Sequence, residues 1–245
     1  MPIKACQSKI LIDQWDFSGA TNGFTVNMEA KSLDYAVLQN CAQLRLPGLP
    51  MANIEHNGYF TGPNAGDMEY EMNARLASVS TIRLACILGT SAAIPVAFVM
   101  NSTFNQQLKY KAHVEGLLEI AGNWPAGNEK LVRGYQVAAA QTVSATGAIT
   151  GIDFGAAGAA GGKAFLQVQT ITGSATNATI TVQSDTDPAF GTAALEGTFT
   201  FSAVGMYEVD LSGVVNRYVR LNCTSKGGAT SFLILGIVAI SGVTY

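Results

Sequence analysis

Charged side chains are scarce in this sequence: Asp, Glu, Lys and Arg make up 13% of its 245 residues, and the formal net charge is −3. No run of Lys or Arg occurs along the chain. Proteins that grip DNA usually carry a basic patch, so that electrostatic signature is missing. So few charges also indicate a surface that is largely covered by other subunits in an assembly. The alternative is a soluble β protein rich in Gly and Ala.

Cysteine pairs and long apolar runs are also lacking. The cysteines lie far apart and form no Cys-x-x-Cys pair; they are Cys6, Cys41, Cys86 and Cys223. No apolar signal segment precedes the first strand-like run, so we expect reduced thiols in a cytoplasmic folding compartment. The most apolar tracts, 84–100 and 232–240, are interrupted by turn residues or are too short to cross a bilayer. We therefore expect no membrane contact.

The motifs of catalytic and metal sites are absent as well. No Gly-x-Ser-x-Gly elbow occurs, and residues 155–163 differ from a phosphate-binding loop because Ala164 replaces the hydroxyl that binds magnesium. His56 and His113 are the only histidines, each without ligand residues nearby in the sequence. Residues 185–188 (Asp-Thr-Asp-Pro) lack the further acidic ligands of a calcium loop. We expect no catalytic residue, no cofactor and no metal.

What is present favours β structure. The 26 glycines and the many Thr and Val residues suit sheets joined by turns. In 23–30, the side chains of Phe24, Val26 and Met28 share one face, as in a half-buried strand. Other strand-like segments of the first half are 9–15, 33–37, 53–61, 80–88, 94–100 and 107–120. Residues 122–128 are interpreted as a turn-rich break.

The second half contains short strand-like segments at close spacing. They cover 146–154, 164–170, 178–183, 198–201, 206–211, 216–223 and 231–240. Tyr218 and Arg220 share one face of their segment, and 232–240 is apolar throughout, as in an interior strand. We therefore divide the chain into domains 1–134 and 135–245 and expect the second to be β-sandwich-like.

One helix is expected after the Gly-Pro-Asn break at residues 62–64. Asp67 and two glutamates occupy its first turns, where negative charge is favoured by the helix dipole. Met68, Met72 and Leu76 repeat at helical spacing and form one apolar stripe. This stripe should anchor the helix to a sheet.

Residues 33–61 form the segment around which the rest of the chain is expected to be arranged. The connector between its two strand-like ends is too long for a tight hairpin and carries a Pro-Gly turn signal, so we predict a long loop. Leucines on a protruding, proline-stiffened loop are most simply explained if another subunit covers them. We therefore predict an inter-subunit loop made of Leu44, Arg45, Leu46, Pro47, Gly48 and Leu49.

Four segments carry a resemblance to a known family. They are Ile-Leu-Ile-Asp-Gln-Trp-Asp-Phe-Ser-Gly at 10–19, Asn-Gly-Phe-Thr-Val at 22–26, Arg-Leu-Pro-Gly-Leu at 45–49 and Gly-Val-Val-Asn-Arg-Tyr-Val-Arg at 213–220. In this order they resemble the tail tube (major tail) proteins of long-tailed bacteriophages, which carry a Pro-Gly-Leu loop early and a "VNRYLR" segment near the end. The middle of the chain is more divergent.

The resemblance implies a mainly β protein, with a tail-tube-type β-sandwich or barrel domain that holds one α-helix, followed by the second sandwich-like domain. It implies a virion structural protein of the tail, assembled in the host cytoplasm. Copies of the chain would join edge to edge into rings, with six subunits each, and the rings would stack into a tube. Other tail proteins would meet the tube ends, and DNA would pass through the lumen without specific binding.

Two alternatives stay open. One is a capsid-decorating or tail-tip structural protein, since the second half resembles a stand-alone sandwich. The other is a carbohydrate-binding module, for which such a sandwich is a common scaffold. The only tryptophans, Trp15 and Trp124, lie outside that half, which leaves few candidates for stacking on sugar. An enzyme is disfavoured by the missing motifs.

Overall fold

The computed structural model describes residues 8–37, 42–78, 82–89, 94–112, 116–127, 130–158 and 161–241, and for residues 31–37 and 42–50 the backbone alone. This part of the chain holds sixteen strands and one helix, arranged in three antiparallel sheets. The prediction of a mainly β protein with a helix is thereby confirmed. Two compact units are present, one from Met1–Ser18, Arg83–Val99 and Val132–Tyr245, the other from Gly19–Ile82 and Met100–Leu131. A domain division at residue 134 stays a prediction.

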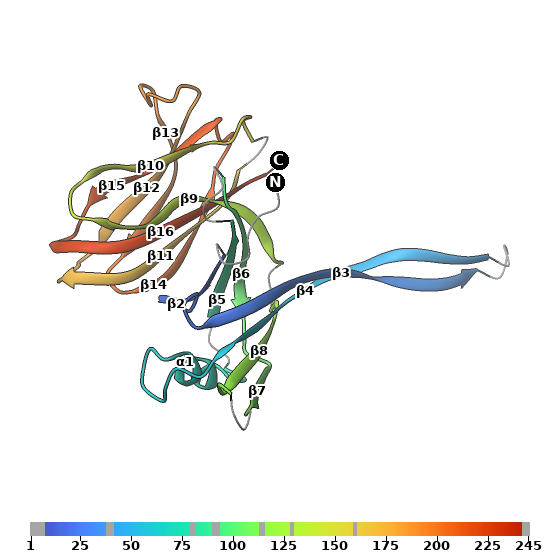
Figure 1. Ribbon diagram of the computed structural model, residues 1–245. Helices are drawn as coiled ribbons and strands as arrows, with labels where there is room; N and C mark the ends of the chain where they lie inside the picture. Colours follow the sequence, from blue (N-terminus) through green and yellow to red (C-terminus); the bar gives the residue numbers. More distant parts are fainter. Residues whose placement is uncertain are drawn as a thin grey trace. The chain divides into compact units, whose positions relative to one another are not determined.

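The first unit contains two sheets (Figure 1). The larger has the order β14-β11-β16-β9-β6-β5-β1-β2, and the smaller the order β10-β15-β12-β13. The strands of the larger sheet are β1 (Lys9–Ile12), β2 (Trp15–Asp16), β5 (Ile82–Leu88), β6 (Val96–Thr103), β9 (Val132–Val143), β11 (Gly162–Gly173), β14 (Gly205–Leu211) and β16 (Ala229–Ile240). Those of the smaller sheet are β10 (Gly147–Asp153), β12 (Ala178–Asp185), β13 (Ala194–Phe201) and β15 (Tyr218–Ser225).

The predicted sandwich is formed by these two sheets. Leu166 and Ile234 of the larger sheet share one buried core with Ile180 and Leu221 of the smaller sheet. Each of the seven segments predicted as a strand after residue 134 is a strand in the structure, although β9, which precedes them, was not predicted. Alternating apolar residues and small turns are therefore a sufficient signal in this half of the chain.

Strand β16 explains the apolar run near the end of the chain. It lies between β11 and β9, and both of its faces are buried. Ile234 belongs to the sandwich core, whereas Leu235 and Ile237 belong to a second cluster with Leu11 and Phe165. Because successive side chains point to opposite faces, a strand buried on both must be apolar at every position. The interior-strand prediction is confirmed.

The second unit is one four-stranded sheet and a helix. The sheet order is β3-β4-β8-β7, with strands β3 (Thr21–Val37), β4 (Ala42–Tyr59), β7 (Gln107–Lys111) and β8 (Glu119–Pro125). Helix α1 (Met68–Ala74) follows Asp67, as expected. The Thr61 hydroxyl accepts a hydrogen bond from the Met68 backbone N–H at 3.0 Å, and the Glu71 carboxylate accepts one from Gly66 at 2.9 Å. These bonds stabilise the start of a helix of only two turns.

Three predictions for this unit are wrong. The segment 107–120 is not one strand, because β7 ends at Lys111 and β8 begins at Glu119. The supposed break at 122–128 is largely strand, since β8 continues to Pro125 and pairs Gly122 with His56 of β4. The predicted loop from Leu44 to Leu49 is also wrong in conformation, because those residues belong to β4.

Cys86 and Cys223 are free and buried, whereas Cys6 and Cys41 lie outside the described residues. In the part of the chain that the structure describes, no helix is long and apolar enough to cross a membrane.

Candidate functional site: a projecting arm on an open sheet

Strands β3 and β4 continue beyond the rest of their sheet as a two-stranded arm, here residues 28–37 and 42–52. Strand β8 pairs with β4 only from Asn53 to Tyr59, whereas β3 pairs with β4 out to Ala42. From Ala42 to Met51, β4 therefore pairs with β3 alone among the described strands. At about 3.3 Å per residue this stretch is about 30 Å long. Figure 1 shows the arm extending away from α1, β7 and β8.

A bulge accounts for the Pro-Gly signal that predicted a loop. The register steps from Ala30 opposite Pro50 to Ser32 opposite Pro47, so two residues of β4 stand against one of β3. Bulges and strands with a free side are the places where a sheet accepts proline, which has no backbone N–H to donate. The side chains from Leu44 to Leu49 lie outside the described residues, and their contact with another subunit stays a proposal.

The base of the arm exposes two methionines. Met28 is 59% exposed and Met51 is 50% exposed, so the half-buried face predicted for 23–30 ends before Met28. Met28 stands opposite Ala52, and Met51 stands opposite Glu29. Because neighbouring residues of a strand point to opposite faces, the two thioethers lie on opposite faces of the arm. Both faces therefore offer apolar contact surface.

The helix covers one face of the four-stranded sheet. Met68 and Met72 are fully buried, and each lies over a glycine. A Cβ at Gly58 would be 2.9 Å from Met68 Sδ, and a Cβ at Gly122 would be 2.3 Å from Met72 Cε. Bare backbone at these two positions therefore lets the methionines approach the sheet.

Leu76, the third residue of the predicted anchor stripe, lies elsewhere. The helix ends at Ala74, two residues before it, and Leu76 is 41% exposed. Its backbone forms an isolated bridge with Asn105. The stripe of three therefore contains two buried residues, because the helix is shorter than its sequence period suggested.

His56 lies beneath the helix in the covered face. It is fully buried, and its Nε2 is 2.8 Å from the Thr21 hydroxyl. Burial lowers the pKa of His56 to about 4, so the imidazole is neutral at physiological pH. No group of three or more potential metal ligands occurs in the described ranges. His113 lies outside them.

The opposite face of the sheet is open and polar. It is hollowed in two places, with volumes of about 330 and 170 Å³, which share Asn57, Lys109 and Ala121. Lys111 lies 3.8 Å from Glu119, a neighbour across the two strands. Positive and negative side chains are thus interspersed, and the face has no strong field of one sign.

Both outer strands of this sheet have a free edge. Strands β3 and β7 are the ends of the order β3-β4-β8-β7 and pair on one side only within the described residues. Four of the five residues of β7 are exposed. Free edges carry backbone N–H and C=O groups that can pair with a strand of another chain.

The roles of Gly58, Gly122, Met28 and Met51 were not predicted from the sequence. The only signal for the glycines was their position inside strand-like alternation, where a glycine often marks a close approach of another element.

Comparisons with known proteins find similar solved structures at low identity. No protein-family model and no curated protein sequence matches the chain. The chain is similar to the SPP1 tail tube (14% identity, 54% of this chain and 78% of that chain, TM-score 0.40). It is similar to a chain of the PVC sheath–tube complex of an extracellular contractile injection system (11% identity, 54% and 90%, TM-score 0.42). It is also similar to SPP1 Dit, a hub protein of the phage adsorption apparatus (10% identity, 95% and 98%, TM-score 0.36).

Proposed function

We propose that the chain is a structural subunit of a phage tail and forms the tail tube by stacking rings of copies of itself. The observation that carries the proposal is the arm. A lone two-stranded ribbon is marginally stable in water at best, and for about 30 Å this one pairs with no third strand of the described residues. A partner that packs on the arm supplies the missing contacts, and the tail-tube resemblance at 10–19, 22–26, 45–49 and 213–220 indicates that the partner is another copy.

Ring formation is supported by the two free edges of the same sheet. If β7 of one subunit pairs with β3 of the next, the sheet continues from subunit to subunit and the edges disappear on closure. The arm of each subunit then reaches a neighbouring ring, with Met28 and Met51 available on its two faces. Six subunits per ring is the number that the tail-tube resemblance implies.

The open face of the sheet suits the lining of a DNA channel. A strongly basic lining would bind phosphate and stall transit, whereas Lys109 and Lys111 alternate here with acidic and amide side chains. In this proposal DNA passes without specific binding, other tail proteins close the tube ends, and the subunit is a virion component that assembles in the host cytoplasm. The role requires no catalysis.

The test is electron microscopy of the purified protein and of a shortened arm. Glu29 and Met51 are a register pair, so residues 30–50 can be replaced by Asn-Gly, which closes a two-residue hairpin on that pair. We expect tubes from the natural chain and none from the short-arm variant, which should still unfold in a cooperative thermal transition. The control is Gly23→Ala on β3, where an added Cβ meets nothing within 4 Å; it should form tubes.

Two results would contradict the proposal. One is a natural chain that stays monomeric at high concentration, and the other is a short-arm variant that forms normal tubes.

A tail-tip structural protein is the second candidate. It is favoured by the sandwich of the first unit, which fills most of the chain after residue 132 and is not needed to build a ring from the other sheet. Single rings that do not stack, in the microscopy above, would favour this candidate over the tube.

A further inference from the structure

The sandwich of the first unit carries a groove on the outer face of its smaller sheet. The groove has a volume of about 380 Å³, which falls within the range of about 300–1,000 Å³ for ligand pockets. Its walls are β10, β15 and the loop between β12 and β13. Its lining includes Gly151, Asp153, Phe190, Tyr218 and Arg220.

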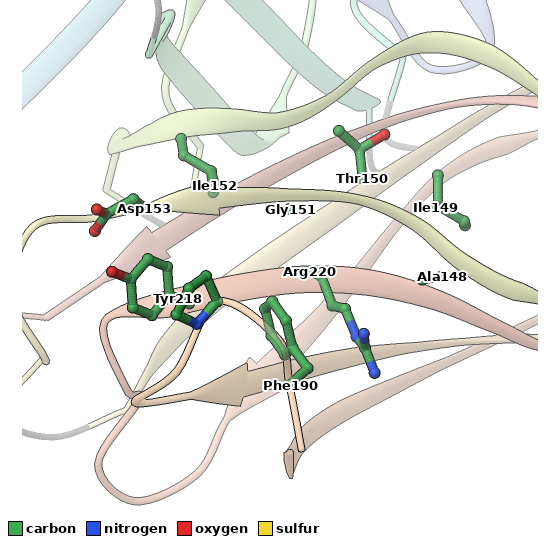
Figure 2. Close-up of a pocket in the computed structure, with 10 residues that line it drawn as sticks. Ala148, Ile149, Thr150, Gly151, Ile152, Asp153, Phe190, Tyr218 and Arg220 are labelled. Atoms are coloured by element: carbon green, nitrogen blue, oxygen red, sulfur yellow. The ribbon is translucent and has the colours of Figure 1, made fainter. Parts of the chain in front are cut away.

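A glycine leaves room between the two strands of the groove. Gly151 of β10 pairs with Arg220 of β15. A Cβ at Gly151 would lie 3.3 Å from Arg220 Cβ and 3.7 Å from Phe190 Cε2. Any larger side chain would therefore enter the space beside the ring and the guanidinium. Figure 2 shows Tyr218, Phe190 and Arg220 gathered along the side of β10 at which Gly151 leaves the backbone bare.

The Arg220 side chain is held in place, but not all of its hydrogen-bond donors have a partner. Its Cζ lies 4.2 Å from the centre of the Phe190 ring, and its Nε donates a hydrogen bond to Gln183 Oε1 at 2.9 Å. Its two terminal nitrogens have no hydrogen-bond partner among the described residues. A stacked guanidinium loses little further entropy when a ligand binds, so these free N–H groups are ready donors.

Phe190 is held in an unfavourable backbone conformation. Its φ is 54°, which bulky residues rarely adopt. The loop is fixed by Asp185, whose carboxylate accepts hydrogen bonds from the backbone N–H groups of Asp187 and Thr192 at 3.1 and 2.9 Å. The Asp187 carbonyl then accepts the Phe190 N–H at 3.1 Å. Strain of this kind persists where the surroundings impose it, often at ligand sites.

The other end of the groove offers an acceptor. Asp153 stands opposite Tyr218, and its carboxylate is oriented by Arg217, whose Nε and terminal nitrogen each donate at 2.7 Å. The groove thus combines aromatic rings, a free cationic donor and an anionic acceptor. Because Arg217 already neutralises Asp153, the carboxylate contributes a hydrogen-bond acceptor rather than a free charge, and a ligand rich in hydroxyl groups can use it together with the free N–H groups of Arg220.

We propose that this groove binds an uncharged pyranose unit of a glycan, a hexose or an N-acetylhexosamine. The apolar face of the sugar ring packs on the wall formed by Phe190 and Tyr218. Each hydroxyl group of the sugar is both a donor and an acceptor. The hydroxyl groups accept hydrogen bonds from the free N–H groups of Arg220 and donate hydrogen bonds to the Asp153 carboxylate. The proposal does not rest on tube formation, because the groove lies wholly in the first unit, whereas the arm lies in the second.

The test begins with a glycan array that displays neutral hexose and N-acetylhexosamine oligosaccharides together with acidic ones. The best neutral ligand is then titrated by calorimetry into the natural chain and three variants. Phe190→Gly removes the ring and places at φ 54° the residue that tolerates it best, so the protein should stay folded. Arg220→Gln shortens the side chain and removes the guanidinium with its free terminal donors. Asn177→Gly is the matched control, since Asn177 has φ 52° and does not line the groove.

We expect Phe190→Gly and Arg220→Gln each to weaken binding by about tenfold or more and Asn177→Gly to leave it unchanged. The proposal is overturned if no neutral glycan binds, if only acidic glycans bind, or if Phe190→Gly binds as the natural chain does. Near-natural melting temperatures for Phe190→Gly and Asn177→Gly separate loss of the site from loss of the fold.

Discussion

Gly58 and Gly122 decide how closely α1 approaches its sheet. At Gly58 an added Cβ would lie 2.6 Å from the carbonyl oxygen of Ala20. That oxygen cannot easily move away, because it accepts the Tyr59 N–H at 2.8 Å. The position therefore requires the absence of a side chain rather than an unusual backbone angle.

The first prediction follows from this crowding. Gly58→Ala should lower the free energy of unfolding by about 1–3 kcal/mol, the usual cost of overpacking. Gly23→Ala, on β3 of the same sheet, has nothing within 4 Å of its Cβ and should be neutral or slightly stabilising. Urea denaturation of both variants checks this, and equal stabilities would contradict it.

His56 supplies a prediction for pH. Its pKa is lowered from 6.5 to about 4 by burial, so below pH 6.5 the unfolded chain takes up a proton that the folded chain does not. The contribution of neutral His56 to the free energy of unfolding is therefore fully present above about pH 6.5 and is lost as the pH falls toward 4. About 2 kcal/mol is lost between pH 7 and pH 5.

The measurement is the urea midpoint of the natural chain and of His56→Gln across this pH range. The variant removes the imidazole, so its midpoint should change less between pH 7 and pH 5 than that of the natural chain. Parallel pH profiles would show that His56 is not responsible.

At the scale of elements, the short helix depends on two of its three predicted anchors. Met72→Ala removes a fully buried side chain and should cost about 2–5 kcal/mol of stability. Leu76→Ala, at a side chain that is 41% exposed, should cost clearly less. Thermal unfolding of the two variants tests the difference, and a larger loss for Leu76→Ala would contradict this description of the helix.

The elements also show where sequence reasoning works. The seven strands from β10 onward were predictable because alternation and Gly or Ser turns recur there, whereas β9 was not predicted. The arm was not, because Pro47 and Gly48 form a turn signal in the sequence but a bulge in the strand. Gly122 led to the wrong prediction of a break at 122–128 for the same reason. In a sequence, a glycine needed for close packing cannot be distinguished from one needed for a turn.

The groove was predictable only in part. That Tyr218 and Arg220 share a strand face follows from their spacing, and this much was available from the sequence. Phe190 lies in a loop 28 residues before Tyr218, and only the fold brings its ring to Arg220. The strained conformation of Phe190 leaves no sign in the sequence, since it is imposed by Asp185 and its hydrogen bonds.

For the whole molecule, the low and mixed charge gives a prediction about nucleic acid. With a net charge of −3 and no Lys or Arg run, the chain should not retain double-stranded DNA in a filter-binding assay, even at about 50 mM salt, where phosphate contacts are strong. The same holds for assembled tubes if DNA only passes through them. Salt-sensitive retention of DNA would contradict the neutral lining.

The bulge between Pro47 and Pro50 has a further consequence for the free chain. A long ribbon with a free side invites further strands to add on, which is how cross-β fibrils grow. Prolines donate no backbone hydrogen bond, and the bulge twists the ribbon locally, so an incoming chain finds an interrupted template. The free chain can therefore reach a high concentration with its arm extended and without aggregating through the arm.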